Sequence, residues 1–249
     1  MSTEQKQHRS LESYTEKEKW DSMSNGRRAQ YIWDYYKLPI VIICVIVYML
    51  SYTVYRHVTH KDTVLYTALV NVGLGGVLEG QITTGFLDDQ GINSGKNQLM
   101  LYSGWYLTDD SSSEYHEYTY ATRLKILAAI DGEQLDVVLM NREAFDAFAQ
   151  NGYLYNLEEL LPEISPELYD EIEDYIITNM EILEDNSQDL MFDPNLEYIS
   201  ETTEYPMAVD LSEAAMIKDA GFGDSVYFGI LGNSPRTEMA VEYLGYLFS

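Results

Sequence analysis

An uncharged run of 18 residues, LPIVIICVIVYMLSYTVY, occupies positions 38–55 between Lys37 and Arg56. As a helix rising about 1.5 Å per residue it spans about 27 Å, close to the hydrocarbon core of a bilayer. The sequence therefore predicts a single transmembrane helix over 38–55, with a buried core helix as the alternative. Aromatic side chains lie near both ends of the run, as in the interfacial belts of membrane helices: Tyr31, Trp33, Tyr35, Tyr36, Tyr48, Tyr52 and Tyr55.

The run does not have the features of a cleaved or lipidated signal. The 37 residues before it are too long and too charged for a signal peptide, and no small-residue cleavage site follows it. Cys44 follows Ile42 and Ile43 rather than a small residue, so we interpret its thiol as an apolar filler. Because the chain has one cysteine, an intramolecular disulfide and a Cys-rich zinc site are excluded.

The segments before the run are predicted to lie on the cytoplasmic side of a bacterial cytoplasmic membrane. Residues 1–26 are polar and predict a loosely structured tail, and residues 27–37 predict an amphipathic juxtamembrane segment. The basic flanking residues favour a cytoplasmic N-terminus by the positive-inside rule. Three precede the run and two follow it: Arg27, Arg28 and Lys37, then Arg56 and Lys61.

Charge divides the chain at the same place. Residues 1–61 carry nine basic and six acidic side chains, a net charge of +3. Residues 62–249 carry six basic and 35 acidic side chains, a net charge of −29. A nucleic-acid-binding domain needs a basic surface, so no nucleic-acid partner is expected. We predict instead an acidic, extracytoplasmic domain over 62–249.

Strand and helix patterns alternate in the first half of this domain. Apolar, β-branched runs predict strands over Thr63–Val72, Gln98–Leu107 and Leu135–Met140, with helical patterns after each one. Asn141 is expected to cap the helix Arg142–Gln150, which ends at Asn151-Gly152. A β-α-β-α-β-α order predicts an α/β fold, a parallel-sheet-based lobe of three layers.

The second half gives a less regular pattern. Ser165-Pro166 predicts the start of a helix whose apolar stripe runs to Ile176, and 181–204 is acidic and aperiodic, which predicts an exposed loop. Short strands are expected over Met207–Leu211 and Ser225–Ile230. A short helix is predicted between them, and a final helix after Ser234-Pro235.

Two stretches carry a family resemblance. The first is ILAAIDGEQLDVVLMNREAFDAFAQNGYLYNLEELL over 126–161, and the second is VYFGILGNSPRTEMAVEYLGYL over 226–247. Together they resemble the extracellular solute-binding proteins of ABC transporters, which have a type 2 periplasmic-binding-like fold. The resemblance implies a solute-binding-like domain, accessory to an ABC-type uptake system. Its partners would then be a transporter permease and a sugar or another small solute.

That family closes two lobes over its ligand, and this chain has room for only one. After residue 55, 194 residues remain, and the segment Ser165–Glu204 is all that could stand for a second lobe. A ligand would then be held from one side. We therefore predict a single lobe, reduced from the family pattern and anchored by the N-terminal helix.

Sequence motifs for catalysis are absent. No G-x-S-x-G elbow and no P-loop occur, and the glycine-rich turn at Gly73–Leu78 departs from G-x-G-x-x-G at its last position. His57 and His60 have helical spacing for a shared metal but no marked third ligand, and Asp185–Asp189 departs from a calcium loop. We expect no enzyme activity, no cofactor and no metal site.

Parallel α/β sheets bind ligands at the carboxyl ends of their strands. The polar and aromatic residues expected there form the predicted ligand site, in which an aromatic ring stacks on a sugar and amides hold its hydroxyls. The alternative is that the rings pack in the core and that Asn141 only caps a helix. The site residues are Asn71, Tyr102, Trp105, Asn141, Asn233 and Ser234.

Three functions remain open at this point. The first is the membrane-anchored solute-binding-like domain. The second is a non-catalytic interaction or scaffold domain that has lost ligand binding and contacts a membrane protein. The third is an extracytoplasmic sensor with residues 2–37 as its signalling tail, although the sequence has no output domain.

Overall fold

A computed structural model describes residues 20–21, 24–193, 195–218 and 225–249. The chain divides into two compact units, Met1–His60 and Lys61–Ser249, which are described separately. Most of the tail predicted over 1–26 lies outside the described residues.

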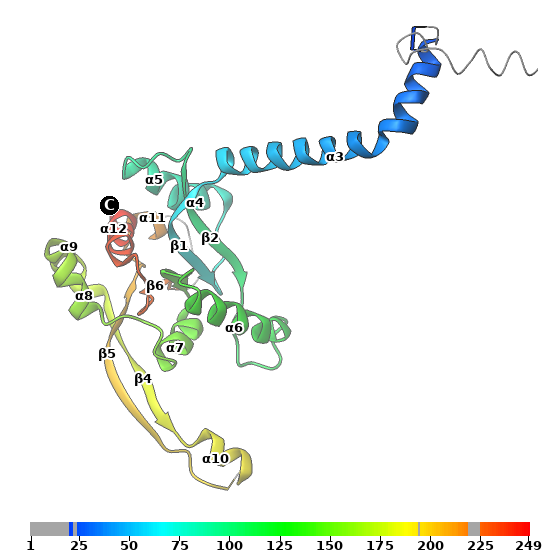
Figure 1. Cartoon of the computed structure of the whole chain (residues 1–249). Coiled ribbons are helices and arrows are strands. Elements are labelled where there is room, and N and C mark those ends of the chain that lie inside the picture. Colours follow the sequence, from blue (N-terminus) through cyan, green and yellow to red (C-terminus); the bar gives the residue numbers. More distant parts are fainter. Residues whose placement is uncertain (1–19, 22–23, 194, 219–224) are drawn as a thin grey trace, which may run out of the picture. The chain divides into compact units, whose positions relative to one another are not determined.

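The described part of the first unit is mainly one helix, α3 (Asn25–Thr59) (Figure 1). The predicted segments 27–37 and 38–55 both lie inside it. Within its part Tyr36–Thr59, an 18-residue window has a mean hydropathy of 2.2 and no buried residue, so this part is long and apolar enough to cross a membrane. A helix buried in the core, the alternative expectation, would have buried side chains, and among the described residues this window has none. Pro39 lies inside α3, where it removes one backbone hydrogen bond.

The second unit is built on one six-stranded sheet with the order β2-β1-β3-β6-β5-β4. Strand β1 pairs in parallel with both β2 and β3. Strand β6 pairs antiparallel with β3 and β5, and β4 pairs antiparallel with β5. The predicted parallel core is thus confirmed, and an antiparallel half is joined to it. The strands are β1 (Asp62–Val70), β2 (Asn97–Trp105), β3 (Val137–Met140), β4 (Ile176–Asp185), β5 (Ser200–Asp210) and β6 (Tyr227–Ile230).

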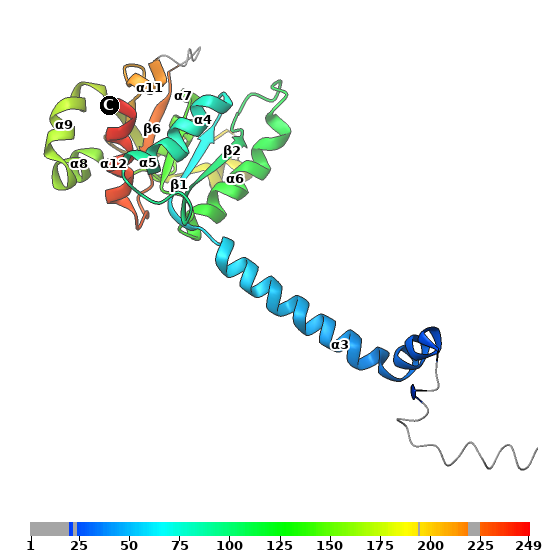
Figure 2. The same cartoon turned by 90° about the horizontal axis from the view of Figure 1, so that it is seen from above.

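Helices cover both faces of the sheet, which confirms the three-layer α/β lobe (Figures 1 and 2). One face packs against α4 (Gly76–Gly80), the π-helical turn Gln81–Gly85, α5 (Phe86–Asp89), α8 (Leu157–Ile164) and α12 (Thr237–Phe248). The other face packs against α6 (His116–Asp131) and α7 (Arg142–Gln150). The remaining described helices are α9 (Pro166–Ile172), the 3-10 turn Glu173–Tyr175, α10 (Ser187–Phe192) and α11 (Ala215–Lys218).

Side chains along the central strands alternate between the two faces of the sheet, and in this way they contribute to both cores. On β1, Leu65 and Leu69 face one core, whereas Ala68 and Val70 face the other. On β3, the residues of Val137–Met140 alternate in the same way and are all buried. Because neighbouring side chains point to opposite faces, a strand covered by helices on both sides is a continuous apolar run.

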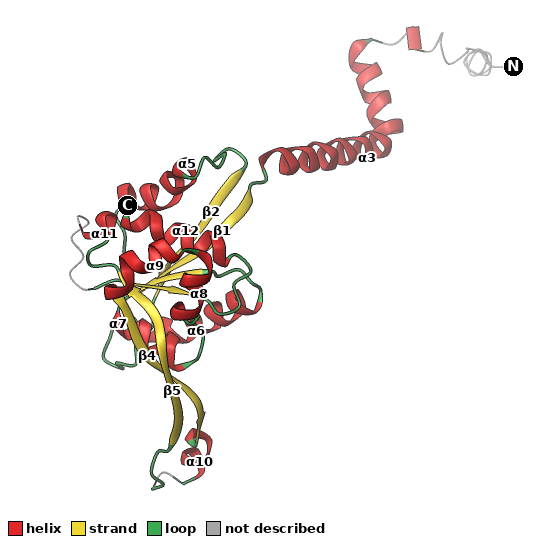
Figure 3. Cartoon of the chain, turned by 90° about the vertical axis from the view of Figure 1, so that its left-hand side faces the viewer, coloured by secondary structure: helices red, strands yellow, loops and turns green. Residues whose placement is uncertain are grey.

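Two predictions for 165–204 are wrong. The helix expected to reach Ile176 ends at Ile172, and Ile176 begins β4. The expected exposed loop over 181–204 contributes to a long β4–β5 hairpin with α10 at its end (Figure 3). Beyond the sheet this hairpin is exposed on both sides, so its strands lack the alternation that identifies a half-buried strand.

A buried carboxylate joins the sheet to the C-terminal helix. Asp136 has no exposed surface and precedes β3. Its Oδ2 accepts from the Tyr66 backbone N–H at 2.8 Å and from Nε of Arg236 at 2.8 Å. Its Oδ1 accepts from the Ser234 hydroxyl at 2.6 Å. The turn that leads into α12 is thereby fixed to the start of the parallel strands.

We expect Asp136→Ala to lower the free energy of unfolding by about 3 kcal/mol, because it leaves a half-buried guanidinium and a buried N–H without their partner. Thermal or urea unfolding measures the loss. The control is Glu213→Gln, which removes a half-exposed ion pair with Lys218; its expected cost is below about 1 kcal/mol. Equal losses in the two variants would contradict a central role for Asp136.

Candidate functional site

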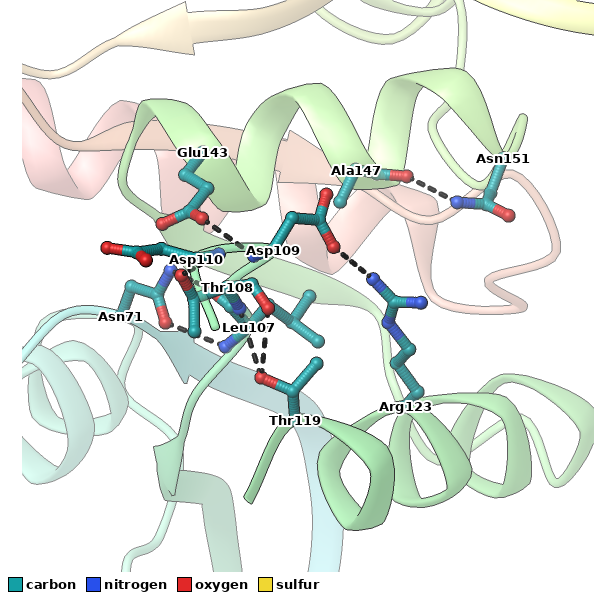
Figure 4. A network of polar contacts seen from close by, with 10 residues as sticks. All are labelled: Asn71, Leu107, Thr108, Asp109, Asp110, Thr119, Arg123, Glu143, Ala147 and Asn151. Carbon is teal, nitrogen blue, oxygen red and sulfur yellow. Dashed lines mark hydrogen bonds and ion pairs between the residues drawn. The ribbon is translucent and has the colours of Figure 1, made fainter. Parts of the chain in front are cut away.

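The structure brings Asn71 and Asn141 together at the carboxyl edge of the parallel strands. Asn71 directly follows β1 in a left-handed conformation, with φ of 58°. Its Nδ2 donates to the Leu107 carbonyl at 2.6 Å and to Oδ1 of Asn141 at 3.1 Å. Its Oδ1 accepts from the Leu107 N–H at 2.8 Å. The side chain therefore fixes the path of the chain after β2 (Figure 4).

Asn141 is a helix cap, as one of the two sequence interpretations expected. Its Oδ1 accepts from the Ala144 N–H at 3.0 Å, which satisfies one free donor in the first turn of α7. The same oxygen accepts from Asn71. Because both amides are bonded inside the domain, a ligand would have to compete with these contacts.

Trp105 and Tyr102 form part of a stack of rings. Trp105 is 7% exposed, and its ring stacks on that of Tyr102 with centroids 5.1 Å apart. Tyr102 in turn stacks on Tyr66 at 6.4 Å, and the Arg236 guanidinium lies 4.8 Å from the centre of the Tyr66 ring. Burial raises the pKa of the Tyr102 phenol, and the charges of Tyr66 and Asp136 raise it further. This geometry supports the packing role for Trp105.

Asn233 and Ser234 lie at the opposite edge of the sheet, so the expectation that they join Asn71 and Asn141 is wrong. Strand β6 is antiparallel to β3, and its last residue, Ile230, pairs with Val137 at the start of β3. The residues that follow β6 therefore emerge at the amino edge of β3. There Asn233 Nδ2 donates to the Ile130 carbonyl at 2.7 Å, and Ser234 donates to Asp136.

A cleft of about 540 Å³ lies between α6 and α7. This volume is within the range of small-molecule sites. The loop after β2 forms one wall, and the buried hydroxyls of Thr119 and Thr122 fix it to α6 by accepting from the backbone N–H groups of Thr108 and Tyr106. The apolar lining consists of Leu107, Ile126, Leu127, Ala147 and Phe148.

Opposite charges face each other across the cleft (Figure 4). Nη2 of Arg123, on α6, lies 2.7 Å from Oδ1 of Asp109, and both side chains are largely exposed. Glu143, at the start of α7, accepts from the Asp109 backbone N–H at 3.1 Å. Asp146 pairs with Arg142 at 3.0 Å and accepts from Nδ2 of Asn179. An exposed pair such as Arg123–Asp109 is weak, so a charged ligand can replace either partner at small cost.

The phenol of Tyr153 also lines the cleft. Partial burial raises its pKa and the charge of Asp131 raises it further, while Arg123 lowers it. The hydroxyl is therefore protonated at neutral pH and is a donor as well as an acceptor.

The cleft offers polar groups of several kinds for contact with a ligand. Carboxylates, a guanidinium, amides and a phenol surround an apolar floor. Within the described ranges, no group of three His, Cys, Asp or Glu side chains could hold a metal ion.

Sequence reasoning missed the cleft residues. Arg123 is one of only six basic residues after position 61, which was the available signal. Glu143 gave no distinct signal of a binding role, because an acidic residue in the first turn of a helix is ordinarily explained by its interaction with the helix dipole.

No protein-family model matches the chain, and no curated protein matches it. Among solved structures, the chain is weakly similar to a TRAP periplasmic solute-binding protein from Ochrobactrum anthropi. The two share 12% sequence identity with a TM-score of 0.26, over 76% of this chain and 77% of that one. A similarity at this level carries no argument about function.

Because Trp105 is buried against Tyr102, we expect Trp105→Ala to lower the free energy of unfolding by about 3 kcal/mol. Chemical denaturation of the full chain measures this loss. The control is Tyr120→Ala on α6, whose side chain is mostly exposed; its expected effect is within about 0.5 kcal/mol. A Trp105 variant as stable as the wild type would favour a ligand-stacking role for the ring.

Proposed function

We propose that the chain is a membrane-anchored, extracytoplasmic solute-binding-like domain whose ligand site is the cleft between α6 and α7. The observation that carries the proposal is the construction of this cleft. It combines an apolar floor, opposed charges on two helices, and a wall fixed by buried threonines. Binding sites for small molecules combine apolar surface with placed polar groups, and this cleft is at the polar end of that range, because seven of its twelve lining residues are polar or charged.

The charges favour a solute with a protonated amine and a short apolar body. Glu143 has no ion-pair partner among the residues that the structure describes, whereas Asp109 and Asp146 each have one. The domain carries a net charge of −29, which raises the local concentration of cations. A sugar site centred on Trp105 is less well supported, because that ring is used in packing.

A single lobe holds such a solute from one side only. The closure of two lobes, which removes a ligand from water on all sides, has no counterpart in the described part of the chain. We therefore propose a low-affinity accessory role, in which the anchored domain supplies solute to a membrane permease of the ABC type.

The β4–β5 hairpin favours a second function, that of an interaction domain. It lies largely within the segment Ser165–Glu204, where the reduced second lobe was expected, and beyond the edge of the sheet its two strands pair with each other. An interaction domain would use this hairpin and leave the cleft empty.

A ligand screen by thermal unfolding of the full chain in detergent micelles separates these functions. At 100 times its Kd, a ligand adds about 2.7 kcal/mol of stability. We expect short alkylamines to raise the Tm and sugars, peptides and metal ions not to. Glu143→Gln should abolish the shift, whereas Glu171→Gln, an exposed position on α9, should preserve it. A shift that survives Glu143→Gln would contradict the cleft site, and no shift with any class would favour the interaction domain.

The proposed topology places the N-terminus in the cytoplasm, because three of the five flanking basic residues precede the span. We expect alkaline phosphatase fused after Lys61 to be active, since this enzyme needs an extracytoplasmic location. The matched control is the same enzyme fused after Lys37, which should be inactive. The reverse pattern would overturn the topology and place the acidic domain inside the cell.

A further inference from the structure

The end of the β4–β5 hairpin is the least buried part of the described domain. At the base, Met207, Ala208 and Val209 are fully buried. Toward the far end both strands are mostly exposed, and the cross-strand pair Asp185↔Ser200 closes a segment that contains α10. Figures 1 and 3 show this segment extending beyond the rest of the lobe. We call residues 183–193 and 195–199 the hairpin tip.

The hairpin tip exposes large apolar side chains. Phe192 is 90% exposed, Met191 84% and Ile199 68%, and all three lie within nine residues of chain. Isolated exposed apolar residues are ordinary, but a group of them on a projecting element indicates a contact surface. The other large apolar residues exposed in the tip are Leu183, Leu196 and Tyr198.

The described part of the tip has a fixed internal structure. Asn186 Oδ1 accepts from the Ile199 N–H at 2.8 Å, and its Nδ2 donates to the Glu197 carbonyl at 2.8 Å. Asp185 accepts from the Ser187 N–H at 3.0 Å and from the Ser187 hydroxyl at 2.6 Å, and these bonds lower the pKa of its carboxyl. A preorganised surface loses less entropy when it binds.

The base of the hairpin is also held. The Tyr205 hydroxyl donates to Oε2 of Glu181 at 2.8 Å, which ties β5 to β4. Burial raises the pKa of this phenol, and the Glu181 carboxylate raises it further. Asn179 on β4 donates to Asp146 on α7 at 2.8 Å. The tip is therefore carried on strands that are fixed to the lobe.

The charge around the apolar group has one sign. No Lys, Arg or His occurs between residues 143 and 217, and eight acidic residues lie between 181 and 204. This uniform negative charge limits which partners could bind the hairpin tip. Anionic lipid headgroups and a second, equally acidic hairpin would both be repelled. A protein with basic side chains around an apolar groove would be attracted.

We propose that the hairpin tip docks into an apolar groove, bordered by Lys and Arg, on another protein. Phe192 and Met191 occupy the groove, and the surrounding carboxylates pair with its basic border. A central aromatic anchor within a charged rim is the usual arrangement of a binding hot spot. This contact goes beyond solute binding in the cleft and does not depend on it.

Site-specific photo-cross-linking in the native membrane tests the proposal with the full chain. A benzophenone amino acid replaces Ile199 in the tip or, as the control, Val77, which is also largely exposed but lies on α4. We expect one protein adduct from position 199 that is absent from position 77. Its cross-linked peptide should contain apolar residues with Lys or Arg beside them, and a higher salt concentration should reduce its yield.

Variants made alongside the probe at position 199 separate the two parts of the proposal. Phe192→Ser should reduce the adduct at least about tenfold, as loss of an aromatic hot spot does. The double change Asp189→Asn with Asp193→Asn should reduce it and weaken its salt dependence. Both changes lie at exposed positions, so an unchanged Tm is expected and verifies that the domain remains folded.

Other outcomes overturn the proposal. These are adducts with lipid only, adducts with a second copy of the chain, no adduct, the same adducts from positions 77 and 199, or an adduct unaffected by Phe192→Ser. None of these results bears on the cleft, because Glu143 and the ligand screen are independent of the tip.

Discussion

The buried carboxylate of Asp136 is the interaction on which the lobe depends. It accepts hydrogen bonds from a backbone N–H of β1, from the Ser234 hydroxyl and from the Arg236 guanidinium, and it directly precedes β3. A buried charge of this kind is tolerated only when several donors satisfy it. The chain is thus held where its C-terminal helix α12 returns to the sheet, and α12 contributes five buried side chains to the core on one face. The same guanidinium also closes the ring stack that begins at Trp105.

The direction of β6 decides which residues can share a site. Because β6 is antiparallel to β3, the polar residues that follow it, Asn233 and Ser234, lie near Asp136. Their side chains make hydrogen bonds within the domain, to the Ile130 carbonyl and to Asp136. Asn71 and Asn141 remain together at the other edge, where their amides hold the chain after β2 and the start of α7. These contacts fix one wall of the α6–α7 cleft. Asn71 and Asn141 therefore support the cleft without lining it, and none of the other four predicted ligand residues borders it.

The hairpin and the cleft give the lobe two separate surfaces. The cleft combines charges of both signs with an apolar floor, whereas the hairpin tip has apolar side chains within acidic surroundings. Contacts of α7 with β4, including Asn179 with Asp146, lie between them. No residue of β4 or β5 lines the cleft, and the exposed hairpin is the surface on which we base the proposed contact with a protein partner.

The sequence by itself determined the features that depend on neighbouring residues. The apolar helix that includes 38–55, the first three strands with their intervening helices, and the Asn141 cap all follow from local periodicity and capping chemistry. Only the tertiary structure decided the β4–β5 pairing, the direction of β6 and the meeting of Arg123 with Glu143 around one cleft. These features depend on residues far apart in the chain. Toward the hairpin tip, both faces of the strand 176–185 are exposed to water, so its sequence shows no clear alternation of apolar and polar residues. Its pairing with 200–210 therefore left no local signal in the sequence.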